Sequence, residues 1–195
     1  MADKTRKLLI SLMVVAVLGT VAGFGIFAAF SQTTVNSDNS FAAGTVTIGD
    51  NDAGSALYNI SNVDPGDSVT SCIRVTYSGS LNSDVHLYTG DPIGAIGPYA
   101  DLTIDAGGQP AATFPDCSGF TPDAGGPLFN GTLAGFSAAH NSWANGLVDY
   151  PGTAATSWTP GDVVVYRFTV TLQDNNAAAG LSSGNHSFTW EAQNQ

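Results

Sequence analysis

The chain has 195 residues and a formal net charge of −11 at pH 7, because 16 acidic residues face only 5 lysines and arginines. A chain this acidic cannot neutralise the phosphates of a nucleic acid, so the composition excludes nucleic acids as partners. Hydrophobic residues make up 43% of the sequence, which suits one domain with a core of its own.

The amino-terminal segment has the layout of an export signal. Its positive charges lie at Lys4, Arg6 and Lys7, and no charged residue then interrupts the apolar and small residues from Leu8 to Phe30. This run is also long enough to cross a bilayer as a helix, so an uncleaved membrane anchor is the alternative interpretation.

A cleavage site is expected at the end of this run. Ala28 is small, as the residue before a cut should be, although Ile26 is larger than the alanine of an A-x-A pattern. We therefore expect a signal helix over residues 1–28, cut between Ala28 and Ala29. Cleavage places the protein outside the cell or on its surface, and contact with the membrane ends at that step.

Removal of the leader makes the protein more acidic still. Only Arg74 and Arg167 remain, against fifteen acidic residues, so the net charge falls to about −13. Such a charge keeps subunits apart, and any self-association must rest on something other than charge attraction. No lysine remains to protect exposed strand edges.

The clearest predicted strand is Val163–Leu172. Its even-numbered residues are apolar, whereas Arg167, Thr169 and Thr171 alternate with them, which indicates a strand buried on one face. The stretch from His186 to Ala192 alternates in the same way, and we expect it to form a carboxy-terminal hairpin with Val163–Leu172 through a long connection.

Earlier strands are expected on the same grounds. Val69, Ile73, Val75 and Tyr77 share one face, and Ser78-Gly79-Ser80 then turns the chain before Val85–Tyr88. Shorter candidates are Thr45–Ile48, Ala56–Ile60 and Ala100–Ile104. Glycine, proline, asparagine and aspartate flank these runs, so the sequence predicts an all-β sandwich.

One segment has a different period. Leu133, Phe136, His140 and Trp143 recur at helical spacing between Gly131 and Gly146. We expect one short helix there, lying as a lid over one end of the sandwich.

The two cysteines follow an export signal, and exported proteins are oxidised. A bond between Cys72 and Cys117 is favoured over two free thiols. Cys72 lies on the face opposite Ile73 and Val75, so the bond should hold the loop 114–120 across the outside of a sheet, in a structural role.

The sequence carries few groups suited to catalysis, and we predict no catalytic residue, no cofactor and no enzymatic activity. His86, His140 and His186 are the only histidines, and none lies in an H-E-x-x-H motif. Asp50 and Asp52 begin a pattern that resembles a calcium loop. However, Gly54 stands at the fifth position and no glutamate follows at the twelfth, so Asp50 and Asp52 are only a weak calcium candidate and a polar turn is favoured.

The order of motifs in the first half of the chain resembles the TasA/camelysin family. The motifs are GFGIFAAFS at residues 23–31, NSFAAGTV at 39–46, NISNVDPGD at 59–67 and YSGSL at 77–81. The resemblance implies a jelly-roll-like β-sandwich, export with a SipW-type signal peptide that the matching signal peptidase removes, and assembly into extracellular fibres of biofilm matrix.

In such fibres the mature amino terminus acts as a donor strand that completes a sheet in the next subunit. Carried over to this chain, residues 29–40 form the donor strand and its hinge, and residues 41–195 form the sandwich domain. The donor strand itself comprises Ala29, Phe30, Ser31, Gln32, Thr33, Thr34 and Val35. The protein would then be its own partner in a homopolymeric, head-to-tail filament.

Two other functions remain open on the sequence. One is a secreted metallo-endopeptidase, as the name camelysin implies. The other is a monomeric cell-surface domain that an uncleaved helix over Leu8–Phe30 anchors to the membrane.

Overall fold

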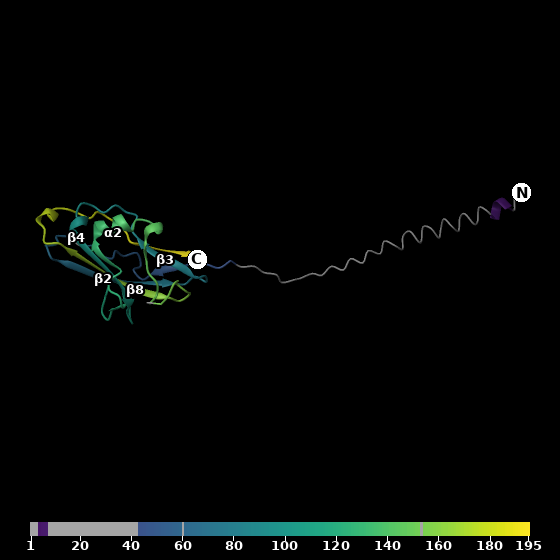
Figure 1. The fold of residues 1–195 in the computed structure, drawn as a ribbon, viewed down its shortest axis with the longest axis horizontal. Coiled ribbons are helices and arrows are strands. Elements are labelled where there is room, and N and C mark those ends of the chain that lie inside the picture. Colours follow the sequence, from purple (N-terminus) through teal and green to yellow (C-terminus); the bar gives the residue numbers. More distant parts are fainter. Residues whose placement is uncertain (1–3, 8–42, 60, 153) are drawn as a thin grey trace. The chain divides into compact units, whose positions relative to one another are not determined.

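The computed structural model describes residues 4–7, 43–59, 61–152 and 154–195. Residues 4–7 are helical. Ala43–Gln195 forms a compact unit, described below (Figure 1). The predicted cleavage site, the donor strand and its hinge lie outside the described residues. No helix within the described ranges is long and apolar enough to cross a membrane.

Two antiparallel sheets form the compact unit, as the prediction of an all-β sandwich requires. The larger sheet contains β1 (Ile48–Asp50), β2 (Ser68–Tyr77), β8 (Val163–Leu172), β4 (Ala100–Gly108) and β5 (Thr121–Pro122) in that order, and β6 (Phe129–Thr132) also pairs with β4. The smaller sheet contains β7 (Leu147–Val148), β3 (Ser83–Tyr88) and β9 (Thr189–Asn194).

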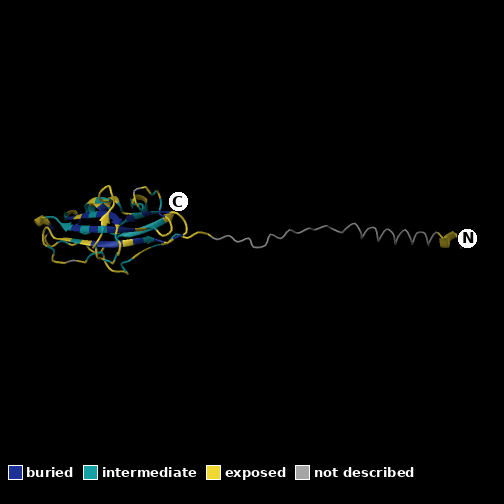
Figure 2. Ribbon diagram, turned by 90° about the horizontal axis from the view of Figure 1, so that it is seen from below, coloured by how far each residue is buried: buried dark blue, intermediate teal, exposed yellow. Residues whose placement is uncertain are grey.

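The alternation of residues in β2 and β8 determines which face of the larger sheet is buried. Ile73 pairs with Tyr166 and Val75 with Val164, and all four side chains are buried. The predicted strand Val163–Leu172 is confirmed residue for residue. Figure 2 shows the buried residues in the central strands and the exposed ones in the connecting loops.

The smaller sheet corrects the predicted carboxy-terminal hairpin. β9 pairs with β3 along its whole length, from Ser83 opposite Asn194 to Tyr88 opposite Thr189, whereas β8 pairs with β2 and β4. The long connection 173–188, with the 3-10 turn η3 (Asn176–Ala178), carries the chain to the other sheet.

Two of the shorter predicted strands differ from the structure. The first strand occupies Ile48–Asp50 rather than Thr45–Ile48, although Thr45 and Thr47 still accept backbone hydrogen bonds from residues 78–81. Residues 56–59 form no strand, because the Leu57 carbonyl accepts a hydrogen bond from the Ser71 hydroxyl instead of joining a ladder.

The predicted short helix is present as α2 (Leu133–Ala139). The Thr132 hydroxyl accepts a hydrogen bond from the Gly135 N–H, 3.0 Å away, and thereby caps its first turn. The helix ends at His140, so Trp143 falls in a separate 3-10 turn, η2 (Trp143–Asn145). A further 3-10 turn, η1 (Gly97–Tyr99), lies before β4 and contacts α2.

The helix belongs to the core that the two sheets share. Phe136 is fully buried and packs against Phe129, with ring centroids 5.0 Å apart, and against Phe188, 5.6 Å apart. Phe188 in turn packs on Phe168 of β8. The helix therefore covers part of the buried face of the larger sheet.

Candidate assembly interface

Two strand edges without a second partner face each other on one side of the sandwich. β1 pairs with β2 and β9 pairs with β3, and neither has another strand neighbour among the described residues. We call the opening between them the β1–β9 seam. It is a cavity of about 230 Å³ lined by Ile48, Gly49, Asp50, Val75, Phe188, Thr189 and Trp190.

Two aromatic residues line the seam, Phe188 directly before β9 and Trp190 within it, and both pack on the core. The Trp190 ring lies 5.4 Å from that of Tyr166 and 5.9 Å from that of Phe168, centroid to centroid. Phe188 lies 4.8 Å from Phe168. The aromatic side chains at the seam therefore pack against β8, a central strand of the larger sheet, rather than against a loop.

Little in the local sequence protects these edges from another strand. Natural edge strands are commonly blocked by lysine, proline or a bulge. β1 and β9 contain no lysine or proline, and a Cβ added at Gly49 would meet nothing within 4 Å. Of the residues that the structure describes, Asp50 is the only one with a charged side chain that lines the seam.

A tight turn ends β1, and it uses the two predicted calcium ligands. The Asp50 carboxylate accepts a hydrogen bond from the Asp52 N–H at 3.2 Å, and the Asp52 carboxylate accepts one from the Gly54 N–H at 2.6 Å. Ala53 and Gly54 have positive φ angles of 53° and 80°. Burial is the main cause that raises the pKa of Asp50. The carboxylates thus cap the turn, as in the polar turn that the sequence favoured over the weak calcium candidate Asp50 and Asp52.

The turn is anchored to the neighbouring strand. The Asn51 side chain accepts a hydrogen bond from the Arg74 N–H at 2.8 Å and donates one to the Ala112 carbonyl at 3.3 Å. Asn51 therefore holds the end of β1 against β2 and against the loop that carries Cys117.

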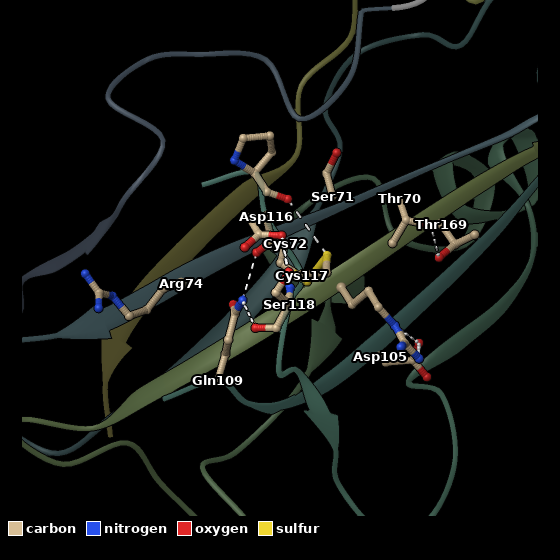
Figure 3. The surroundings of a disulfide bond; sticks show 12 residues. Thr70, Ser71, Cys72, Arg74, Asp105, Gln109, Asp116, Cys117, Ser118 and Thr169 are labelled. Atoms are coloured by element: carbon tan, nitrogen blue, oxygen red, sulfur yellow. Dashed lines mark hydrogen bonds and ion pairs between the residues drawn. A yellow bond between two sulfur atoms is a disulfide. The ribbon is translucent and has the colours of Figure 1, made fainter. Parts of the chain in front are cut away.

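The disulfide between Cys72 and Cys117 is confirmed. Figure 3 shows it on the face of β2 that carries Arg74, away from the core. The Gln109 side chain donates hydrogen bonds of 2.9 Å to the carbonyls of Asp116 and Ser118, and Arg167 lies over the Phe120 ring at 4.8 Å. The bond holds the loop across the outside of the larger sheet, as predicted.

The three histidines are held apart in separate contacts. His86 stacks on Trp143 with ring centroids 3.9 Å apart, His140 packs on Phe136 at 5.0 Å, and His186 contacts Tyr58 at 5.6 Å. No three histidine, cysteine or acidic side chains gather into a possible metal site within the described ranges. These residues do not fit the zinc site that a metallo-endopeptidase requires.

Sequence reasoning missed a half-buried carboxylate on the opposite side of the sandwich. Asp149 follows β7 directly and faces the hydroxyl of Tyr166, at a cavity of about 150 Å³ also lined by Asp123. Burial raises the pKa of Asp149 to about 6. Its only sequence signal is an acidic residue directly after a short apolar run, and that pattern is too common to single it out.

Comparison with known protein families finds a match for residues 4–94 of the chain. No curated protein matches the sequence. Residues 4–94 match the family described as camelysin metallo-endopeptidase, a span that includes β1, β2 and β3 and all four motifs on which the predicted resemblance rests. The predicted resemblance is therefore confirmed over residues 4–94, which match the model of the camelysin family.

Proposed function

We propose that this protein is a secreted structural subunit of extracellular fibres, such as those of a biofilm matrix. In this proposal the mature amino-terminal strand, Ala29–Val35, inserts into the β1–β9 seam of a neighbouring subunit. The observation that carries the proposal is the seam itself, where two strand edges without a second partner among the described residues flank an opening that Val75, Phe188 and Trp190 help to line. The family match supports export.

The dimensions of the donor suit the seam. Seven extended residues reach about 23 Å, and the six residues of β9 extend over about 20 Å. Backbone hydrogen bonds to a free edge would provide most of the affinity, as in strand addition generally. A strand at this position would share a sheet with β9 or with β1.

Phe30 is the natural side-chain anchor. It is the only aromatic residue in Ala29–Val35, and the seam presents Val75, Phe188 and Trp190. An apolar cavity of about 150 Å³ can hold a benzene molecule. The cavity at the seam, about 230 Å³, therefore has room for a phenyl ring.

Charge also favours this pairing. Each mature subunit carries a net charge near −13, so two subunits repel each other at a distance. The donor Ala29–Val35 has no charged residue. It can therefore enter the seam without adding to the repulsion between the two domains.

Donation of this kind is head-to-tail, and such contacts give open filaments rather than closed dimers. Because the cut lies directly before Ala29, cleavage of that one peptide bond releases the donor strand from the leader. A SipW-type signal peptidase would thus control when assembly begins. The protein would contact the membrane only before this processing step.

Blocking the seam tests the proposal. Gly49→Trp fills the seam from β1, where the added side chain meets open space. Gly90→Trp is the matched control, because Gly90 also has open space around it and does not line the seam. We expect folded monomers of G49W that form no filaments by electron microscopy, and normal filaments of G90W. Normal filaments of G49W would refute the seam as acceptor.

The family description keeps a second function in view, a metallo-endopeptidase. Measurement of bound zinc, together with casein cleavage with and without a chelator, distinguishes the two functions. Stoichiometric zinc with chelator-sensitive cleavage would favour the enzyme. The third alternative, an anchored monomer, is separated by sequencing the mature amino terminus, which we expect to begin at Ala29.

A further inference from the structure

Asp149 is fixed where the smaller sheet meets the larger one. Its carbonyl accepts a hydrogen bond of 2.7 Å from the indole N–H of Trp158, which is fully buried. Trp158 in turn exchanges two backbone hydrogen bonds with Ser83, at the start of β3. The position of Asp149 is therefore tied to the smaller sheet through β7 and through β3.

The side chain of Asp149 is half-buried and lines the cavity that it shares with Asp123. Its Oδ2 atom is buried and has no hydrogen-bond partner among the residues that the structure describes. The groups that face it are the hydroxyl of Tyr166 from β8 and the carboxylate of Asp123 across the cavity that both acids line. The Tyr150 N–H also faces the carboxylate.

No positive charge in the described domain compensates this carboxylate. Arg167 pairs with Asp105 at 2.9 Å on the outer face of the larger sheet, and Arg74 is exposed on the same face. His86 lies near Glu191, on the outside of the smaller sheet. An ionised Asp149 is thus a half-buried charge whose covered Oδ2 atom has no cation beside it among the described residues, and the Asp123 carboxylate lies across the same cavity.

Tyr166 connects this carboxylate to both sheets. The residue is 1% exposed, and burial raises the pKa of its hydroxyl well above the usual range, so it remains a hydrogen-bond donor at physiological pH. Its ring packs under Trp190 of β9. The Trp190 indole nitrogen is also buried without a hydrogen-bond partner among the described residues.

We propose that Asp149 is a proton-operated latch between the two sheets. In the uncharged form the half-buried side chain avoids the cost of burying a charge, and Asp149, directly after β7, stays beside Tyr166 of the larger sheet. Ionisation leaves an unpaired charge beside Tyr166 and Asp123, which loosens the contact between the sheets. This device does not depend on whether the protein polymerises.

The direction of the pH dependence follows from linkage. Burial, and to a smaller extent Asp123, raise the pKa of Asp149 from its usual value near 3.9 to about 6. The folded state therefore holds the proton more tightly than the unfolded state. The stabilisation is complete below about pH 4 and is lost as the pH rises through 6.

The test compares the pH dependence of stability in three forms of the processed protein. These are the wild type, Asp149→Asn, and the control Asp174→Asn, which changes an exposed acid. Between pH 4 and 8 we expect the unfolding constant of the wild type to rise relative to that of D149N by on the order of 100-fold. We expect D174N to follow the wild type. Parallel profiles for the wild type and D149N would overturn the proposal.

A second measurement applies if D149N does not fold. NMR titration of the Asp149 side-chain carboxyl carbon in the wild type should show a midpoint near pH 6. Exchange of the Trp158 indole proton, corrected for its intrinsic pH dependence, should quicken above that midpoint because its acceptor is the Asp149 carbonyl. A midpoint near 4, or protection of the indole that does not change with pH, would contradict the latch.

Discussion

Removal of the disulfide should lower stability mainly through the unfolded chain. We consider the double variant Cys72→Ala, Cys117→Ser. Cys72 is 2% exposed, so alanine is the safer replacement there, whereas the half-buried Cys117 tolerates serine. The loop keeps several native contacts without the bond, including the hydrogen bond of 3.0 Å from the Cys72 N–H to the Pro115 carbonyl.

The expected loss follows from the length of the closed loop. The bonded cysteines are 45 residues apart. In the chain-entropy model a loop of this size contributes about 4 kcal/mol to the free energy of unfolding. With a denaturant slope of about 2 kcal/mol per molar urea, the midpoint should fall by about 2 M. The melting temperature should fall by about 8–16 °C.

Urea unfolding followed by tryptophan fluorescence is a suitable assay, because Trp158 is fully buried and its emission reports on the core. The wild type measured with a reductant is the control, and it should show the same midpoint as the double variant. A midpoint within about 0.5 M of the oxidised wild type, with a native spectrum, would refute the entropic reasoning.

Two further predictions concern the core and the processing site. Phe136→Ala removes a fully buried ring that packs on Phe129 and Phe188, and it should lower the free energy of unfolding in urea by about 3–5 kcal/mol. Phe136→Leu should lower it clearly less, and equal losses would show that the site collapses around either residue. Ala28→Phe should leave an unprocessed, membrane-bound protein without fibres, whereas Ala28→Gly should be processed normally, and abundant fibres of A28F would contradict control of assembly by cleavage.

Local patterns in the sequence determined much of the fold. The alternation in Val163–Leu172 sets its buried face whatever its neighbours are, because successive side chains of a strand point to opposite sides. The same reasoning placed Cys72 on the outer face, and an oxidising compartment then favoured its bond to Cys117. The period of Leu133 and Phe136 indicated a helix for a similarly local reason.

The sequence did not determine which strands are neighbours. The alternation in β9 fits a place beside β8 as well as one beside β3, and the connection 173–188 is long enough for either. The choice rests on packing, since Phe188 and Trp190 meet Phe168 across the core rather than along one sheet. Side-chain period specifies a face, but the partner of a strand depends on contacts between distant residues.

The same limit explains why the two features of greatest interest emerge from the tertiary structure. The β1–β9 seam exists because two edge strands, far apart in the chain, lie next to each other, and no strand from residues 43–59, 61–152 or 154–195 lies between them. Among the described acids, Asp149 is distinguished by its place beside the buried hydroxyl of Tyr166. The family and the composition of the donor strand can be read from the sequence, because both depend on residues that are contiguous. The proposed acceptor, the β1–β9 seam, and the proposed latch at Asp149 can be recognised only in the fold, because burial and open strand edges depend on residues that only folding brings together.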